Sequence, residues 1–231
     1  VLTDVRLFYE YAERVWQGAL PYRDFRIEYP PLAVPLMLIP RLAASGLVGY
    51  VAGFVSLMFL VNVLVVASIA VTTARTSGAA EALKRVRWYT VCYCLMCPLA
   101  VVRFDLFPAL LCMLSVVAWR HAAWKTGGLL AGVGALVKVF PAVAAAVVIV
   151  GARSKDRPRV HAVAASFAAV VAAGAVLWLL LGGFAGIERS LKFQVGRGLE
   201  VESIYAGLMF AASATGLLDA HPTFDETAWH L

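Results

Sequence analysis

The sequence predicts an all-α protein, a polytopic membrane bundle of helices. Of its 231 residues 62% are hydrophobic and 15% are charged, and the mean hydropathy is +0.82, which is outside the usual range of soluble domains. Two apolar runs, Leu47 to Val71 and Val160 to Gly183, each exceed the roughly 20 residues that a helix needs to cross a ~30 Å hydrocarbon core. Both runs are therefore predicted to be membrane-spanning helices.

The first segment, residues 1–30, is polar and rich in aromatic residues, and we predict an outer loop there. Within it, Asp4 to Gln17 predicts an amphipathic helix that lies in the membrane interface and ends at Gly18. Its apolar positions recur at helical spacing and its polar positions occupy other faces: Val5, Phe8, Ala12, Val15 and Trp16, against Arg6, Glu10, Glu13 and Gln17. After a turn, the residues Glu28 to Pro31 start the next helix, because proline suits a first helical turn.

Three short stretches rich in Lys and Arg are predicted to be cytoplasmic connections, because basic residues favour that side of a membrane. They are Arg75 to Arg87, Arg120 to Lys125 and Arg153 to Arg159. Between the first two, Tyr89 to Val102 and Leu106 to Trp119 predict two helices that are short for full spans. Residues 103–105 join them at the outer side.

The segment from Gly127 to Val150 contains Lys138 and Pro141, which predict a broken helix or a tight hairpin. The apolar run that follows returns the chain to the outer side, so residues 184–214 form an outer loop region in the same compartment as the first segment. Residues 215–231 are predicted to be a polar tail.

The whole chain, residues 1–231, is assigned to a single transmembrane domain with membrane helices over residues 31–183, because we find no repeat or low-complexity linker. We expect it to be a fragment, since it begins at Val1 rather than Met and stops in a polar stretch. Membrane lipids are expected partners.

Composition also argues against several classes of ligand. The net charge of +6 is explained by the basic connections, and no basic run is interleaved with exposed aromatic residues, so a nucleic-acid partner is not expected. The cysteines of YTVCYCLMC, residues 89–97, lie in an apolar run and are expected to pack as small hydrophobic side chains. No metal site and no cofactor are predicted.

Five motifs occur in order along the chain: TDV, GALPYRDFRIEYPPL, RFDLFPALL, ALVKVFPA and QVGRGLEVESI, which begin at Thr3, Gly18, Arg103, Ala135 and Gln194. Together they resemble the bacterial polyprenyl-phosphate-sugar-dependent glycosyltransferases of the GT-C type, and in particular the mannosyltransferases of glycosyltransferase family 87. The resemblance implies a GT-C-type bundle with short broken helices. It also implies further spans before and after this chain, which supports the expectation of a fragment.

The same resemblance implies the reaction. A sugar passes from a polyprenyl phosphate to a glycolipid or polysaccharide acceptor at the extracytoplasmic face. The resemblance implies mannose as this sugar, and the alternative is arabinose or another pentose. The anomeric centre inverts, and Asp4 matches the family's proposed general base. A sugar hydroxyl needs such a carboxylate to take its proton, and a single inverting displacement needs no second, covalent carboxylate. The alternative role of Asp4 is an N-cap or a partner of the helix dipole.

Cations are expected to receive the departing lipid phosphate. The candidates are Arg103, Lys138 and Arg197, since Arg forms bidentate phosphate contacts and Lys supplies a point charge. Each has an ordinary alternative: Arg103 pairs with Asp105, Lys138 snorkels to the interface, and Arg197 is a solvated loop charge.

Further substrate-binding candidates surround these cations in the motifs: Glu28, Tyr29, Asp105, Gln194, Glu200 and Glu202. Glu28 is either a site residue or a first-turn dipole partner, and Tyr29 either stacks on a sugar or belongs to an interfacial aromatic belt. Glu200 and Glu202 face one side of an extended stretch, where they bind sugar hydroxyls or a hydrated divalent ion.

Two other function classes compete with the enzyme. A transporter of a small polar or anionic substrate would also use a broken helix with Lys138, Arg103 and Asp105 near the middle of the membrane. A noncatalytic membrane scaffold would use the amphipathic helix of the first segment as a docking surface.

Overall fold

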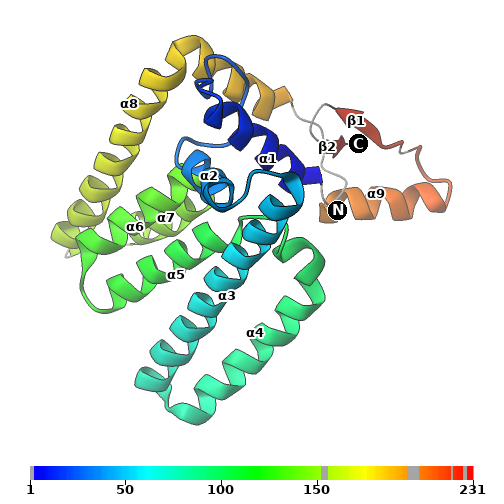
Figure 1. Ribbon diagram of the computed structural model, residues 1–231. Helices are drawn as coiled ribbons and strands as arrows, with labels where there is room; N and C mark the ends of the chain where they lie inside the picture. Colours follow the sequence, from blue (N-terminus) through cyan, green and yellow to red (C-terminus); the bar gives the residue numbers. More distant parts are fainter. Residues whose placement is uncertain (1–2, 152–155, 197–202, 220, 226–227, 231) are drawn as a thin grey trace.

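A computed structural model describes residues 3–151, 156–196, 203–219, 221–225 and 228–230. The chain is an all-α membrane bundle, as predicted (Figure 1). Its helices are α1 Thr3–Trp16, α2 Ala33–Ala43, α3 Leu47–Ser77, α4 Ala79–Ala100, α5 Leu106–Arg120, α6 Trp124–Val137, α7 Pro141–Val150, α8 Arg157–Gly196 and α9 Ile204–Ala214. Two three-residue strands, β1 Thr223–Asp225 and β2 Ala228–His230, pair antiparallel near the carboxyl end.

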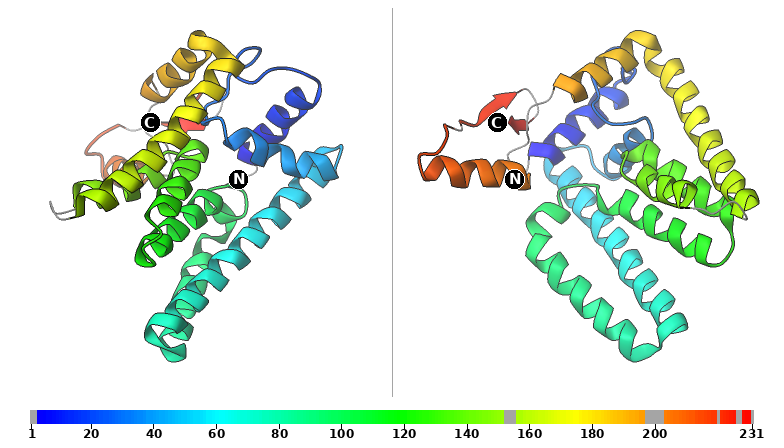
Figure 2. Two further views of the ribbon diagram at one scale, coloured as in Figure 1. Left: turned by 90° about the vertical axis from the view of Figure 1, so that its left-hand side faces the viewer. Right: turned by 180° about the vertical axis from the view of Figure 1, so that it is seen from behind.

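In the part of the chain that the structure describes, two helices are long and apolar enough to cross a membrane, and they contain the two predicted spans. Mean hydropathy reaches 2.6 in Leu47–Ser77 and 2.3 in Arg157–Lys192. The α3–α4 hairpin extends away from the other helices in both views of Figure 2. The helices α2, α5 and α7 have 10 to 15 residues each, so at 1.5 Å per residue they are too short to cross alone. The predicted break is confirmed, because α6 ends at Val137 and α7 begins at Pro141.

The first basic connection was predicted wrongly. Instead of a loop from Arg75 to Arg87, one residue, Gly78, separates α3 from α4. Gly78 has φ 88°, a conformation that suits glycine and lets the chain reverse at one position. The charged residues after it continue as helix, supported by the i,i+4 ion pair of Arg85 Nε with Glu81 Oε1 at 3.0 Å. Helix α4 therefore begins at Ala79, nearly three turns before the predicted start at Tyr89.

The prediction of an outer loop over residues 184–214 is also corrected, because most of that range is helical. Helix α8 continues past a kink at Gly183, where φ is 62° and ψ −175°, and α9 follows. The kink redirects the helix without ending it, and the pair Lys192 Nζ–Glu188 Oε1 at 2.7 Å joins successive turns beyond it. The predicted polar tail contains the β1–β2 hairpin.

The predicted amphipathic helix is confirmed, and its apolar face packs inside the protein. Val5, Phe8 and Ala12 of α1 are each at most 1% exposed. Trp16 remains 54% exposed and lies under the Arg41 guanidinium of α2, 4.9 Å from the ring centroid. The apolar residues of α1, which we expected to face the membrane interface, therefore pack against other parts of the protein.

The loop between α1 and α2 is held against the second half of α8. The Ser190 hydroxyl donates to the Ile27 carbonyl at 2.8 Å, and the Arg189 guanidinium donates to the Tyr22 carbonyl at 3.0 Å. Gly186 allows this close approach, since a Cβ there would lie 2.8 Å from the Tyr22 carbonyl oxygen. The segment that carries Glu28 is fixed by these contacts.

Gly186→Ala should lower the free energy of unfolding in detergent by about 1–3 kcal/mol, because the added methyl overlaps the loop backbone. Gly207→Ala in α9 is the matched control, since a Cβ there meets nothing within 4 Å. Equal stability of the two variants would show that α8 does not press on the loop.

Candidate active site

An ion pair joins the first helix to the connection between α4 and α5. Arg103 Nε lies 3.1 Å from Asp4 Oδ2. Asp4 stands in the first turn of α1, and Arg103 is the third residue after α4 ends. Their side chains are 23% and 28% exposed, so both are partly shielded and still reach the surface. The predicted base and one predicted phosphate ligand are therefore neighbours.

A second ion pair links the same connection to the break between α6 and α7. Lys138 Nζ contacts Asp105 Oδ1. Lys138 follows α6 in extended conformation, with φ −154° and ψ 137°, and Asp105 precedes the first residue of α5. Asp105 therefore pairs with Lys138, while Arg103 pairs with Asp4.

An aromatic cluster fills the space between these ion pairs. Phe104, which is 2% exposed, lies 5.1 Å from Phe8 and 5.0 Å from Tyr29 between ring centroids. Phe8 and Tyr29 pack edge to face at 5.8 Å. Lys138 Nζ lies 5.9 Å from the Phe104 centroid, within cation–π range. Tyr29 thus has a packing role between two phenylalanines.

The Glu28–Tyr29 segment is tied down on two sides. The Tyr22 hydroxyl donates to the Tyr29 carbonyl at 2.8 Å, and Tyr22 itself has a positive φ of 67°. The Leu32 amide donates to the Leu136 carbonyl at 3.0 Å, which fixes the segment beside the end of α6. Lys138 lies two residues after Leu136, so this hydrogen bond also places the segment near Lys138 in the chain.

Glu28 is 6% exposed and lies five residues before α2 begins. This position does not fit the expected role of a first-turn dipole partner. Burial raises the pKa of the Tyr11 hydroxyl above its ordinary value, and the negative charge of Glu28 raises it further. Glu28 is therefore a buried group near α1.

The remaining predicted site residues belong to the segment after α8's kink. Gln194 falls in the last turn of α8. Arg197, Glu200 and Glu202 lie outside the described residues. Among the residues that the structure describes, no group of three His, Cys, Asp or Glu side chains is placed to hold a metal ion.

Sequence reasoning missed Phe8 and Phe104 as parts of the site. One signal was available, because Asp4 and Phe8 are four residues apart and share a face of α1. Another was the position of Phe104 between two charged residues of a short connection. Neither signal identifies the partner of each charge, which depends on the packing of distant segments.

The arrangement provides a carboxylate and two cations around one aromatic cluster. Asp4 can accept a proton, while Arg103 and Lys138 can donate charge-assisted hydrogen bonds to an anion. Arg103 contacts Asp4 and Lys138 contacts Asp105. An incoming anion would therefore compete with these carboxylates for the two cations. This chemistry suits a group-transfer reaction in which the leaving group departs as an anion.

Comparison with known families gives an independent result. The model of glycosyltransferase family 87 matches residues 27–214, about four fifths of the chain. The match contains Arg103, Asp105 and Lys138, and Asp4 precedes it. No curated protein and no solved structure matched the chain.

A double-mutant cycle should show that the pair Asp4–Arg103 contributes to stability. Asp4→Asn and Arg103→Gln should couple by about 1–2 kcal/mol in the free energy of unfolding in detergent, since both side chains are partly shielded. The control pair is Arg6–Glu10 on the same helix, whose side chains are 71% and 49% exposed and should couple only weakly. Equal coupling in the two cycles would contradict a structural role for the Asp4 pair.

Proposed function

The chain belongs to glycosyltransferase family 87, and from this premise we propose that it transfers mannose from a polyprenyl phosphate to a glycolipid or polysaccharide acceptor, with inversion. Membership of the family makes it a membrane glycosyltransferase. The observation that carries the finer proposal is the contact between Asp4 and Arg103, because it unites a base and a leaving-group cation.

Asp4 acts as the general base in this proposal. Its carboxylate is held through Oδ2 by Arg103 and is 23% exposed, so an acceptor hydroxyl can approach it. The acceptor O–H bond breaks and its proton passes to the carboxylate, while the acceptor oxygen forms the new bond to the anomeric carbon. The bond from that carbon to the phosphate oxygen breaks, and its electron pair stays on the phosphate.

Arg103 and Lys138 stabilise the charge that develops on the departing phosphate. The planar guanidinium of Arg103 favours bidentate contact, and the ammonium of Lys138 adds a second positive charge. When the donor binds, its phosphate competes with Asp4 for Arg103 and with Asp105 for Lys138. Contact of Arg103 with the phosphate releases the Asp4 carboxylate, so the base becomes available when the donor is present.

The other predicted residues take supporting roles in the proposal. Buried Glu28 and the packed ring of Tyr29 hold the segment after the α1–α2 turn, and Asp105 positions Lys138 before the donor arrives. Gln194, Arg197, Glu200 and Glu202 are assigned by resemblance to contacts with the sugar and the phosphate.

The positions of the basic residues support a multi-pass topology with the site outside. Arg103 and Lys138 follow the carboxyl ends of α4 and α6, whereas Lys84 and Lys125 lie near the amino ends of these helices. Since basic residues favour the cytoplasmic side, the opposite helix ends face the extracytoplasmic side. The reaction therefore takes place at the outer face.

Asp4→Asn should lower sugar transfer by roughly 10²- to 10⁴-fold while the donor still binds, because the amide cannot take the proton. The measurement is transfer of labelled mannose from polyprenyl-phosphate mannose by the full chain in membranes. Glu10→Gln, which neutralises an exposed carboxylate of the same helix, should retain activity. Undiminished transfer by Asp4→Asn would reject the base assignment, and uptake of substrate without transfer would favour a transporter.

Lys138→Gln should lower kcat/KM for the donor by roughly 10²-fold, because one charge-assisted contact with the departing phosphate is lost. Lys138→Arg should recover part of this loss, since the positive charge is kept. Lys125→Gln near the other end of α6 is the control and should leave the kinetics unchanged. If Lys138→Gln changed only thermal stability, its ion pair with Asp105 would be purely structural.

A further inference from the structure

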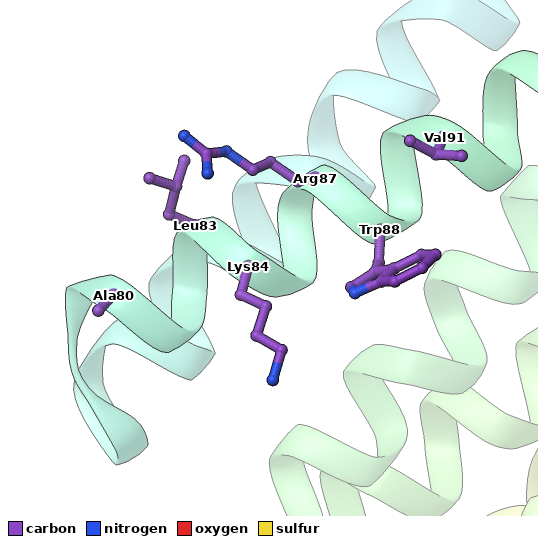
Figure 3. A pocket seen from close by; sticks show the side chains of 6 residues that line it. All are labelled: Ala80, Leu83, Lys84, Arg87, Trp88 and Val91. Carbon is purple, nitrogen blue, oxygen red and sulfur yellow. The ribbon is translucent and has the colours of Figure 1, made fainter.

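One side of α4 forms a surface hollow in the half of the helix nearer Gly78, away from the end that leads to Arg103. The hollow measures about 500 Å³, within the ~300–1,000 Å³ usual for ligand sites. Six side chains of α4 line it: Ala80, Leu83, Lys84, Arg87, Trp88 and Val91. Steps of three and four residues place them along one stripe of the helix, and Figure 3 shows Lys84 and Trp88 directed to the same side.

This stripe is exposed along its whole length. Leu83 is 51% exposed, Trp88 64% and Val91 51%. The opposite side of α4 packs against α3, where the Tyr89 hydroxyl donates to Asn62 Oδ1 at 2.6 Å. In the part of the chain that the structure describes, the stripe is therefore the free side of the hairpin.

The two basic residues of the stripe lie between apolar ones. Ala80 and Leu83 are nearest the hairpin turn at Gly78, and Lys84 and Arg87 follow within nine residues of that turn. Trp88 and Val91 lie further along the helix. Among the described residues, neither the Lys84 nor the Arg87 side chain forms a hydrogen bond or a close ion pair. The Glu81 carboxylate is bound by Arg85, and the positive charge of Lys84 acts on it only at longer range. The hollow therefore offers two cations beside an apolar wall.

We propose that this hollow binds one phospholipid with an anionic head group. Lys84 and Arg87 contact the phosphate, while Trp88 and Val91 lie along the glycerol and the first part of an acyl chain. Basic side chains at the end of a membrane helix attract anionic lipids, and an indole ring favours the level of the head groups. The match of charge and polarity along the stripe distinguishes this ligand from a soluble anion, which would leave Trp88 and Val91 uncovered.

The bound lipid is distinct from the sugar donor. Arg87 lies 13 residues before the end of α4 at Ala100, which corresponds to about 20 Å at the helical rise of 1.5 Å per residue, and Arg103 follows that end. The hollow therefore serves to attach the α3–α4 hairpin to the lipid, independently of the proposed reaction.

Native mass spectrometry of the full chain in detergent tests the proposal, with equal amounts of phosphatidylglycerol and phosphatidylcholine added. We expect one phosphatidylglycerol to be retained in preference to phosphatidylcholine. The double variant K84Q/R87Q should weaken its retention by roughly thirtyfold, the change expected when two basic contacts at a membrane surface are lost. Trp88→Ala should also weaken retention, because the apolar wall is shortened.

Arg85→Gln is the matched control, since it removes one positive charge from the same turn outside the hollow and should leave retention unchanged. Glycerol phosphate at equal concentration should displace little lipid, because it lacks the acyl chain. Equal retention of the two lipids, a K84Q/R87Q variant that binds like the original chain, or full displacement by glycerol phosphate would overturn the proposal. So would a dimer that K84Q/R87Q dissociates, because the stripe would then bind a second copy.

Discussion

The contact between Asp4 and Arg103 is the constraint on which the site depends, because it joins segments 99 residues apart in the sequence. Two charges held partly out of water cost solvation energy, which their mutual attraction offsets only when the geometry is fixed. The packing of Phe8 against Phe104 directly beside the pair supplies that geometry. An amphipathic helix and a short connection thereby form one rigid unit with opposite charges at its surface.

The candidate site is built where helices end. Arg103 and Asp105 lie between α4 and α5, and Lys138 lies where α6 is interrupted before α7. Irregular backbone at membrane depth is tolerated where protein or water satisfies its polar groups. Such positions bring charged side chains together without placing them on a lipid-facing helix. Hydrogen bonds from α8 hold the loop between α1 and α2 in place.

The fold was predictable where one short-range signal dominates. Continuous apolar residues identified α3 and α8, and Pro141 beside Lys138 identified the break after α6. The start of α4 and the part of α8 beyond Gly183 were missed, because charged residues inside a helix resemble a loop in composition. Helix α9 was missed as well, although it contains no charged residue. The site residues were gathered by motif, but the pairing of Asp4 with Arg103 and of Asp105 with Lys138 depends on tertiary packing, which no local pattern encodes.

An experimental structure of the full chain with a polyprenyl-phosphonate mannose, which cannot release its sugar, would measure the proposed arrangement directly. We predict that the phosphonate contacts Arg103 and Lys138, and that the Asp4 carboxylate, released from Arg103, faces the anomeric carbon from the side opposite the phosphonate. A donor analogue bound away from these side chains, with the Asp4–Arg103 ion pair intact, would contradict the assignment of base and leaving-group cations.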